Sequence, residues 1–116
     1  MDALKAELSQ HFGFLEVAGF VLEIQGYSPK HFGNFVATYA SPDLTIRLTR
    51  DRSQVFVGLA AKNESWLDKE ALLEKIGVPR TRHPTLSGLW SGYELATQAQ
   101  DLQQFLPKIR EAVRDS

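Results

Sequence analysis

Apolar and polar residues alternate along the chain from Phe35 to Ala61, and this pattern predicts three consecutive strands. Successive side chains of a strand point to opposite faces of its sheet, so a period of two indicates a strand with one buried face. The clearest buried rows are Leu44, Ile46 and Leu48, followed by Val55, Val57 and Leu59. Two short polar segments, Ser41-Pro42-Asp43 and Arg50-Asp51-Arg52-Ser53, suit tight turns between the strands. The run therefore predicts an antiparallel meander.

The second strand of the sheet, residues 35–40, is apolar or small on both of its faces. Its pattern leaves open which face is buried. A further strand is predicted before it, because Phe20, Leu22 and Ile24 alternate with more polar neighbours. Residues 26–33 are expected to form a loop after that strand.

Helical periodicity precedes and follows the strands. Leu4, Leu8, Phe12 and Leu15 lie on one face of a helix over residues 3–15, which Gly13 could end early. Ser65 followed by Asp68 suits the start of a second helix, which runs through Trp66 and Leu67 to Ile76 and is ended by Gly77 and Pro79. Residues 78–92 read as a long loop or a short irregular strand. A long helix follows, carrying Leu95, Ala99, Leu102, Leu106, Ile109 and Val113, and Pro107 is expected to kink or divide it.

This order of elements predicts an α+β fold. The expected architecture is a four-stranded antiparallel meander sheet with an N-terminal helix and two C-terminal helices packed mainly on one face. With 116 residues, the chain fits one domain, residues 1–116.

Composition narrows the classes of partner. The formal net charge is −1, so the molecule has no overall field that would attract nucleic acid or an anionic membrane, and we expect neither as a partner. No apolar run approaches the roughly 20 residues of a membrane span. The absence of Cys excludes disulfides and thiolate chemistry and favours the cytoplasm. The first eight residues lack the apolar segment of a signal peptide.

Catalytic motifs are not apparent in the sequence. The three histidines, His11, His31 and His83, are widely spaced, and neither a Gly-x-Ser-x-Gly elbow nor a phosphate-binding glycine loop occurs. We therefore expect no catalytic residue, no metal and no cofactor. A pair of carboxylates that meets only in space stays open.

Two groups of residues are candidates for binding a partner. Arg80, Arg82 and His83 form a basic segment in the long loop, and Trp90 follows close behind. Arginine and tryptophan concentrate binding energy at interfaces, so this segment suits an acidic partner. The alternative is that the arginines are solvated and Trp90 closes the end of the core. Arg47 is the second candidate, between Thr45 and Thr49 on the outward face of its strand.

One family resemblance is carried by structural motifs. The motifs are Phe32-Gly33-Asn34-Phe35, Ser41-Pro42-Asp43-Leu44, Asp51-Arg52-Ser53-Gln54-Val55-Phe56-Val57 and Trp66-Leu67-Asp68. They resemble small bacterial immunity-type proteins encoded beside polymorphic toxins, and they cover about a third of the chain. Ser53 occupies a turn position where a glycine is expected. The resemblance implies a binding role and supplies no site residue.

Three functions are consistent with these patterns. The first is a non-enzymatic protein-binding domain, with a toxin-neutralising immunity protein of bacteria as its specific form. The second is a small-ligand-binding or enzymatic domain with a pocket between sheet and helices, anchored by Arg47 or His83. The third is a homodimeric structural protein that pairs through the mixed faces of its strands.

Overall fold

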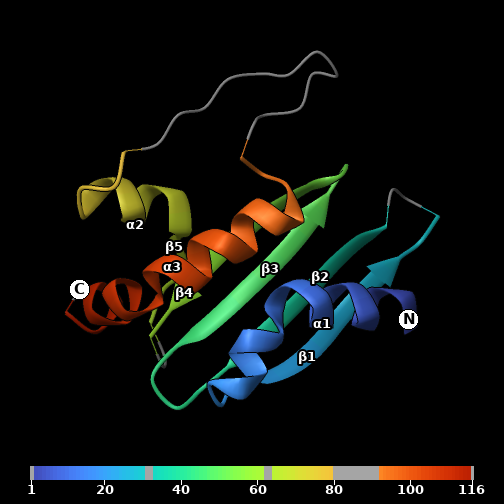
Figure 1. The fold of residues 1–116 in the computed structure, drawn as a ribbon, viewed down its shortest axis with the longest axis horizontal. Coiled ribbons are helices and arrows are strands. Elements are labelled where there is room, and N and C mark those ends of the chain that lie inside the picture. The colour runs from blue at the N-terminus through green and yellow to red at the C-terminus, as the bar shows by residue number, and fades with distance from the viewer. Residues whose placement is uncertain (1, 31–32, 62–63, 80–91, 116) are drawn as a thin grey trace.

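The fold is a two-layer α+β structure in which helices cover one face of a twisted antiparallel sheet (Figure 1). The computed structural model describes residues 2–30, 33–61, 64–79 and 92–115. Its elements in chain order are α1 (Asp2–Val17), β1 (Val21–Ser28), β2 (Asn34–Ala40), β3 (Thr45–Asp51), β4 (Gln54–Ala60), β5 (Leu67–Asp68), α2 (Lys69–Lys75) and α3 (Leu95–Arg114).

The sheet has the strand order β1-β2-β3-β4-β5, with each strand antiparallel to its neighbour. The meander predicted from the sequence is confirmed, but the expected number of four strands is wrong. The fifth strand, β5, is two residues long and pairs with Gly58 and Leu59 of β4. A two-residue segment is too short to show alternation in the sequence, so β5 can be recognised only from its pairing with β4 in the structure.

The core lies between the sheet and the helices. In β2, the face that was ambiguous in the sequence is resolved, because Phe35, Ala37 and Tyr39 are buried. These residues line up in register with the buried rows of β3 and β4, so three strands present one continuous apolar inner face. In Figure 1, α1 lies over β1 and β2 while α3 lies over β3 and β4. Their buried faces close the layer with Leu4, Leu8, Phe12, Leu15, Leu95, Ala99, Leu102, Ile109 and Val113.

Helix α1 continues past Gly13 and ends at a different glycine. Gly19 has φ 96°, and its N–H donates to the Glu16 carbonyl at 3.1 Å while Phe20 N–H donates to the Leu15 carbonyl at 2.9 Å. This pair of bonds is a Schellman motif, in which glycine adopts the left-handed conformation without steric cost.

Strand β1 extends to Ser28, beyond the predicted start of the loop. The register shifts between Ile24 and Gly26, which indicates a β-bulge at Gln25. Because one extra residue is inserted, the bulge returns Tyr27 to the inner face opposite Phe35. Simple alternation cannot cross such a bulge, so the pattern ended the strand early.

Helix α2 begins later than the sequence suggested. Asp68, rather than Ser65, is the N-cap, and its carboxylate accepts a hydrogen bond from the Ala71 N–H at 3.1 Å. Trp66 and Leu67 precede the helix, since pairing with β4 holds Leu67 and Asp68 extended. The predicted end is confirmed, because Gly77 has φ 94° and forms the same kind of cap as Gly19.

Helix α3 runs without interruption from Leu95 to Arg114, so Pro107 does not divide it. The long loop predicted before this helix falls mostly on residues 80–91, outside the described ranges. Among the described residues, no helix is both long and apolar enough to cross a membrane.

Arg50 belongs to β3 rather than to the predicted turn. Its side chain lies at the end of the inner face, where it pairs with Glu7 of α1 at 3.0 Å and donates from Nε to the Gly33 carbonyl at 2.9 Å. The guanidinium also lies 5.0 Å from the centre of the Phe35 ring. Arg50 therefore joins α1, the chain before β2 and β3 at one end of the sheet.

Candidate functional site

Arg47, the one residue predicted to bind a partner that lies in the described ranges, is found on the outer face of the sheet. The strand registers place one residue from each of the five strands in a single row across the outer face, namely Glu23, Thr38, Arg47, Gly58 and Asp68. Arg47 is central in this row because β3 is the middle strand of the five. Helices α1 and α3 cover the opposite face, so no described helix lies over Arg47 (Figure 1).

Arg47 is held by an aromatic ring. Its guanidinium carbon lies 4.3 Å from the centre of the Trp66 ring, which is cation–π geometry. Gly58 lies beneath the two side chains and makes this possible. A Cβ at position 58 would come within 3.3 Å of the Trp66 ring and 3.7 Å of the Arg47 guanidinium. The absence of a side chain in β4 therefore creates the space in which Arg47 and Trp66 stack.

A hollow of about 260 Å³ adjoins this stack, lined by Arg47, Thr49, Phe56, Val57, Gly58, Trp66, Leu67 and Asp68. Phe56 and Trp66 are 40% and 41% exposed, which is high for large aromatic side chains. The Phe56 ring packs at a tilt against Tyr93, with 5.1 Å between the ring centres. We call Arg47, Thr49, Phe56, Gly58 and Trp66 the outer-face patch.

The electrostatics of the patch favour an anionic group. Among the described residues, Arg47 forms no ion pair with a carboxylate, and its side chain is partly exposed. Asp68, the carboxylate that lines the same hollow, is engaged in capping α2. A planar guanidinium fixed in position binds a carboxylate with two parallel hydrogen bonds, so the patch can accept an Asp or Glu side chain.

Only one of the five residues proposed from the sequence for partner binding can be placed. Arg47 lies on the outer face, as its alternation in β3 predicted. Arg80, Arg82, His83 and Trp90 lie outside the described residues, so the basic loop segment stays a prediction. Trp66 was not among these five residues, because its contact with Arg47 arises only once β5 pairs with β4 and brings Trp66 beside Gly58.

The interface between the sheet and helices α1 and α3 is filled by the core, and Arg47 lies on the other side of the sheet from it. Arg47 therefore does not face that interface, and a ligand pocket there anchored by His83 stays a prediction, since residue 83 lies outside the described ranges. A separate groove lies between α2 and α3, lined by neither Arg47 nor any histidine. In the described ranges, no three His, Cys, Asp or Glu side chains gather as a metal site would require.

One buried ionic cluster lies away from the patch. The amine of Lys69, which is fully buried, lies 2.7 Å from a Glu70 oxygen and 2.6 Å from an Asp101 oxygen. Because the two carboxylates enclose the amine, Lys69 is not accessible as a nucleophile. The cluster joins α2 to α3, and we assign it a structural role.

Comparisons of the chain with protein-family models, with curated proteins and with solved structures each found no match.

Proposed function

We propose that this protein is a non-enzymatic protein-binding domain that contacts its partner through the outer-face patch. The observation that carries the proposal is the Arg47–Trp66 stack, a cation with no described carboxylate partner, fixed against a half-exposed tryptophan on a sheet face that no described helix covers. Arg and Trp are the side chains that most often dominate interface energies. Preorganisation of the pair lowers the entropy lost on binding.

The partner of this patch presents an acidic side chain within an apolar surround. Phe56 and Trp66 supply apolar area on either side of the hollow, and Arg47 supplies the charge. This arrangement, a charged anchor flanked by aromatic rings that exclude water, is typical of the centre of a protein interface. The specific role we propose is that of a bacterial immunity protein neutralising a toxin, as the resemblance of the β2–β4 motifs implies.

The test measures binding to the product of the reading frame next to the gene for this protein. The full chain is titrated with that product by calorimetry, as wild type, as Arg47→Ala and as Arg114→Ala. We expect Arg47→Ala to weaken binding by about 2 kcal/mol or more, roughly thirty-fold in Kd, because the lost side chain leaves an acidic partner group buried and unpaired.

Arg114→Ala is the matched control, since Arg114 is a highly exposed arginine in the last turn of α3 on the helical layer. It should bind like the wild type. A neighbouring product unlike any toxin, together with a pull-down from native lysate that recovers no stoichiometric partner, would contradict the proposal. Light scattering at micromolar concentration separates it from the homodimer hypothesis, which requires a dimer without any other chain.

A further inference from the structure

A second surface feature is a groove between α2 and α3 beside strand β5, which includes no residue of the outer-face patch and shares only Leu67 and Asp68 with the hollow next to that patch. It has a volume of about 370 Å³ and is lined by Leu67, Asp68, Ala71, Leu72, Lys75, Ile76, Ala112 and Asp115. Five of these eight side chains are apolar. The walls come from three elements, β5, α2 and the last turns of α3, so packing of the core fixes their positions.

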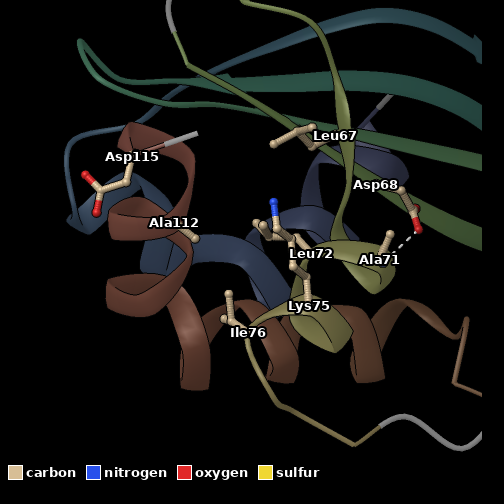
Figure 2. Close-up of a pocket in the computed structure, with 8 residues that line it drawn as sticks. All are labelled: Leu67, Asp68, Ala71, Leu72, Lys75, Ile76, Ala112 and Asp115. Carbon is tan, nitrogen blue, oxygen red and sulfur yellow. Dashed lines mark hydrogen bonds between the residues drawn. The ribbon is translucent and has the colours of Figure 1, made fainter.

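Small side chains keep this groove open. Ala71 of α2 and Ala112 of α3 occupy positions where a larger side chain would fill the space between the helices (Figure 2). Ile76 at the end of α2 remains 36% exposed, so the groove leaves an apolar side chain uncovered. The volume is at the lower end of the range for small-molecule pockets, about 300–1,000 Å³.

The three charged side chains that line the groove differ in their interaction partners and in the direction in which they point. Asp68 caps α2 through the Ala71 N–H, and Asp115 lies 4.0 Å from Arg114 and points away from the groove in Figure 2. The Lys75 side chain instead runs along the groove, and its amine lies between the α2 wall and Leu67 in the same view. Among the described residues, Lys75 has no ion-pair partner.

We propose that this groove binds a small single-chain amphiphile with a carboxylate head group, such as a medium-chain fatty acid. The apolar walls would take the alkyl chain, and the Lys75 ammonium would pair with the carboxylate. Charge complementarity decides the sign of the head group, because Lys75 is the one side chain of the lining whose charge is directed into the groove without a described partner. The volume favours one chain over two.

The experiment titrates the isotopically labelled full chain with decanoate, below its micellar concentration, and follows amide chemical shifts. Decanol and decyltrimethylammonium are the neutral and cationic probes of equal chain length. We expect saturable decanoate shifts confined to β5, α2 and the last turns of α3. Lys75→Gln should weaken decanoate binding about five-fold, the equivalent of about 1 kcal/mol, and leave decanol binding nearly unchanged.

Two further variants complete the test. Ala112→Phe fills the groove and should abolish binding of decanoate and decanol together. Lys108→Gln removes an exposed lysine of α3 that does not line the groove, and it should bind decanoate like the wild type. Equal binding of decanoate and decyltrimethylammonium, unchanged decanoate binding in Lys75→Gln, or an absence of saturable shifts would each overturn the proposal. None of these outcomes depends on the outer-face patch.

Discussion

Two residues of the β3–β4 turn, Arg52 and Ser53, have left-handed backbone conformations that are strained for non-glycine residues. Arg52 and Ser53 have φ 51° and 71°, and the pair Asp51 and Gln54 closes the hairpin around them. Two consecutive positive φ values define the turn that matches the right-handed twist of the strands, and glycine is strongly preferred in its second position. Asn34 supports the turn by accepting a hydrogen bond from the Arg52 N–H at 3.0 Å.

Replacing Ser53 by glycine should therefore stabilise the protein. A non-glycine residue in this region costs roughly 1–2 kcal/mol, part of which is offset by the greater chain entropy of glycine when unfolded. We expect Ser53→Gly to raise the free energy of unfolding by about 0.5–1 kcal/mol, measured by urea denaturation. Ser9→Gly, at an exposed position of α1, is the control and should lower it. A less stable Ser53→Gly variant would contradict the argument.

The buried hydroxyl of Tyr39 is a second single-residue feature that lowers the stability of the fold. Tyr39 is fully buried, and its hydroxyl has no hydrogen-bond partner among the described residues. Burial raises the pKa of this hydroxyl far above its ordinary value, and the Glu16 carboxylate adds to the effect. Since an unpaired buried polar group costs about 1–3 kcal/mol, Tyr39→Phe should be at least as stable as the wild type and up to about 1 kcal/mol more stable in urea at neutral pH. A loss of stability larger than about 1 kcal/mol would mean that the hydroxyl is paired.

Asp43, in the β2–β3 turn, links stability to acid pH. The Ser41 hydroxyl donates to its carboxylate at 2.8 Å and, with a smaller contribution from Arg110, lowers the pKa of Asp43. A carboxyl group whose pKa is lower in the folded state stabilises the fold above its unfolded pKa of about 3.8, and this contribution disappears as the pH falls through the folded value. The effect is small because the side chain is largely exposed.

We therefore expect the stability of the wild type to fall more than that of Asp43→Asn when urea denaturation at about pH 6 is repeated at about pH 2.5. Asp115→Asn is the comparison carboxylate, in the exposed C-terminal turn. If Asp43→Asn loses as much stability as the wild type over this range, the Ser41 hydrogen bond does not contribute in solution.

At the level of elements, alternation of apolar and polar residues correctly predicted the strands with one buried face. It misplaced an element boundary where a β-bulge or a shared strand and helix residue altered the pattern. The rows of β3 and β4 are confirmed because Ile46 and Leu48 of β3 and Val55, Val57 and Leu59 of β4 are all buried, and only Arg50 at the end of β3 interrupts the apolar inner side. The end of β1 was missed because the bulge at Gln25 inserts a residue that breaks the period. The start of α2 was misplaced because Asp68 both pairs with β4 and caps the helix, so one residue ends a strand and begins a helix.

The buried Lys69 amine links α2 to α3 through its ion pairs with Glu70 and Asp101. Removing it should leave the Glu70 and Asp101 carboxylates close together with low exposure and without their shared cation. We expect Lys69→Met to lower the free energy of unfolding by about 3–5 kcal/mol. The double variant Lys69→Met with Asp101→Asn should recover part of this loss, since it removes one of the two carboxylate charges that the Lys69 amine contacts.

A double-mutant cycle measured by urea denaturation checks this prediction. Lys5→Met, at an exposed position of α1, is the control and should change stability by no more than about 0.5 kcal/mol. If Lys69→Met is nearly neutral and no coupling to Asp101 is found, the cluster is not what holds α2 against α3.

For the whole molecule, the two faces of the sheet differ in what covers them. The inner face is completed by α1 and α3, whereas the outer face carries the patch and has no described helix over it (Figure 1). Arg47 could be placed on that outer face from the sequence, because its neighbours Ile46 and Leu48 are buried. The contact between Arg47 and Trp66 could not be predicted from the sequence, since Gly58 and Trp66 are brought next to Arg47 only by the register of β3, β4 and β5. Alternation reveals which face a residue occupies, and register reveals its neighbours.

This division predicts that the proposed binding surface can be removed without unfolding the protein. The double variant Arg47→Ala with Trp66→Ala loses a partly exposed cation–π pair, so we expect its free energy of unfolding to fall by about 1 kcal/mol or less. Leu48→Ala alters the same strand on its fully buried side and should cost about 2–5 kcal/mol through lost burial and a cavity. Urea denaturation of the three proteins gives both values. If the outer-face variant were as costly as Leu48→Ala, Arg47 and Trp66 would serve the fold, and a loss of partner binding in Arg47→Ala could no longer be attributed to a lost contact. A small cost would support the proposed binding role of Arg47, which has no ion-pair partner among the described residues, and of the half-exposed Trp66 beside it.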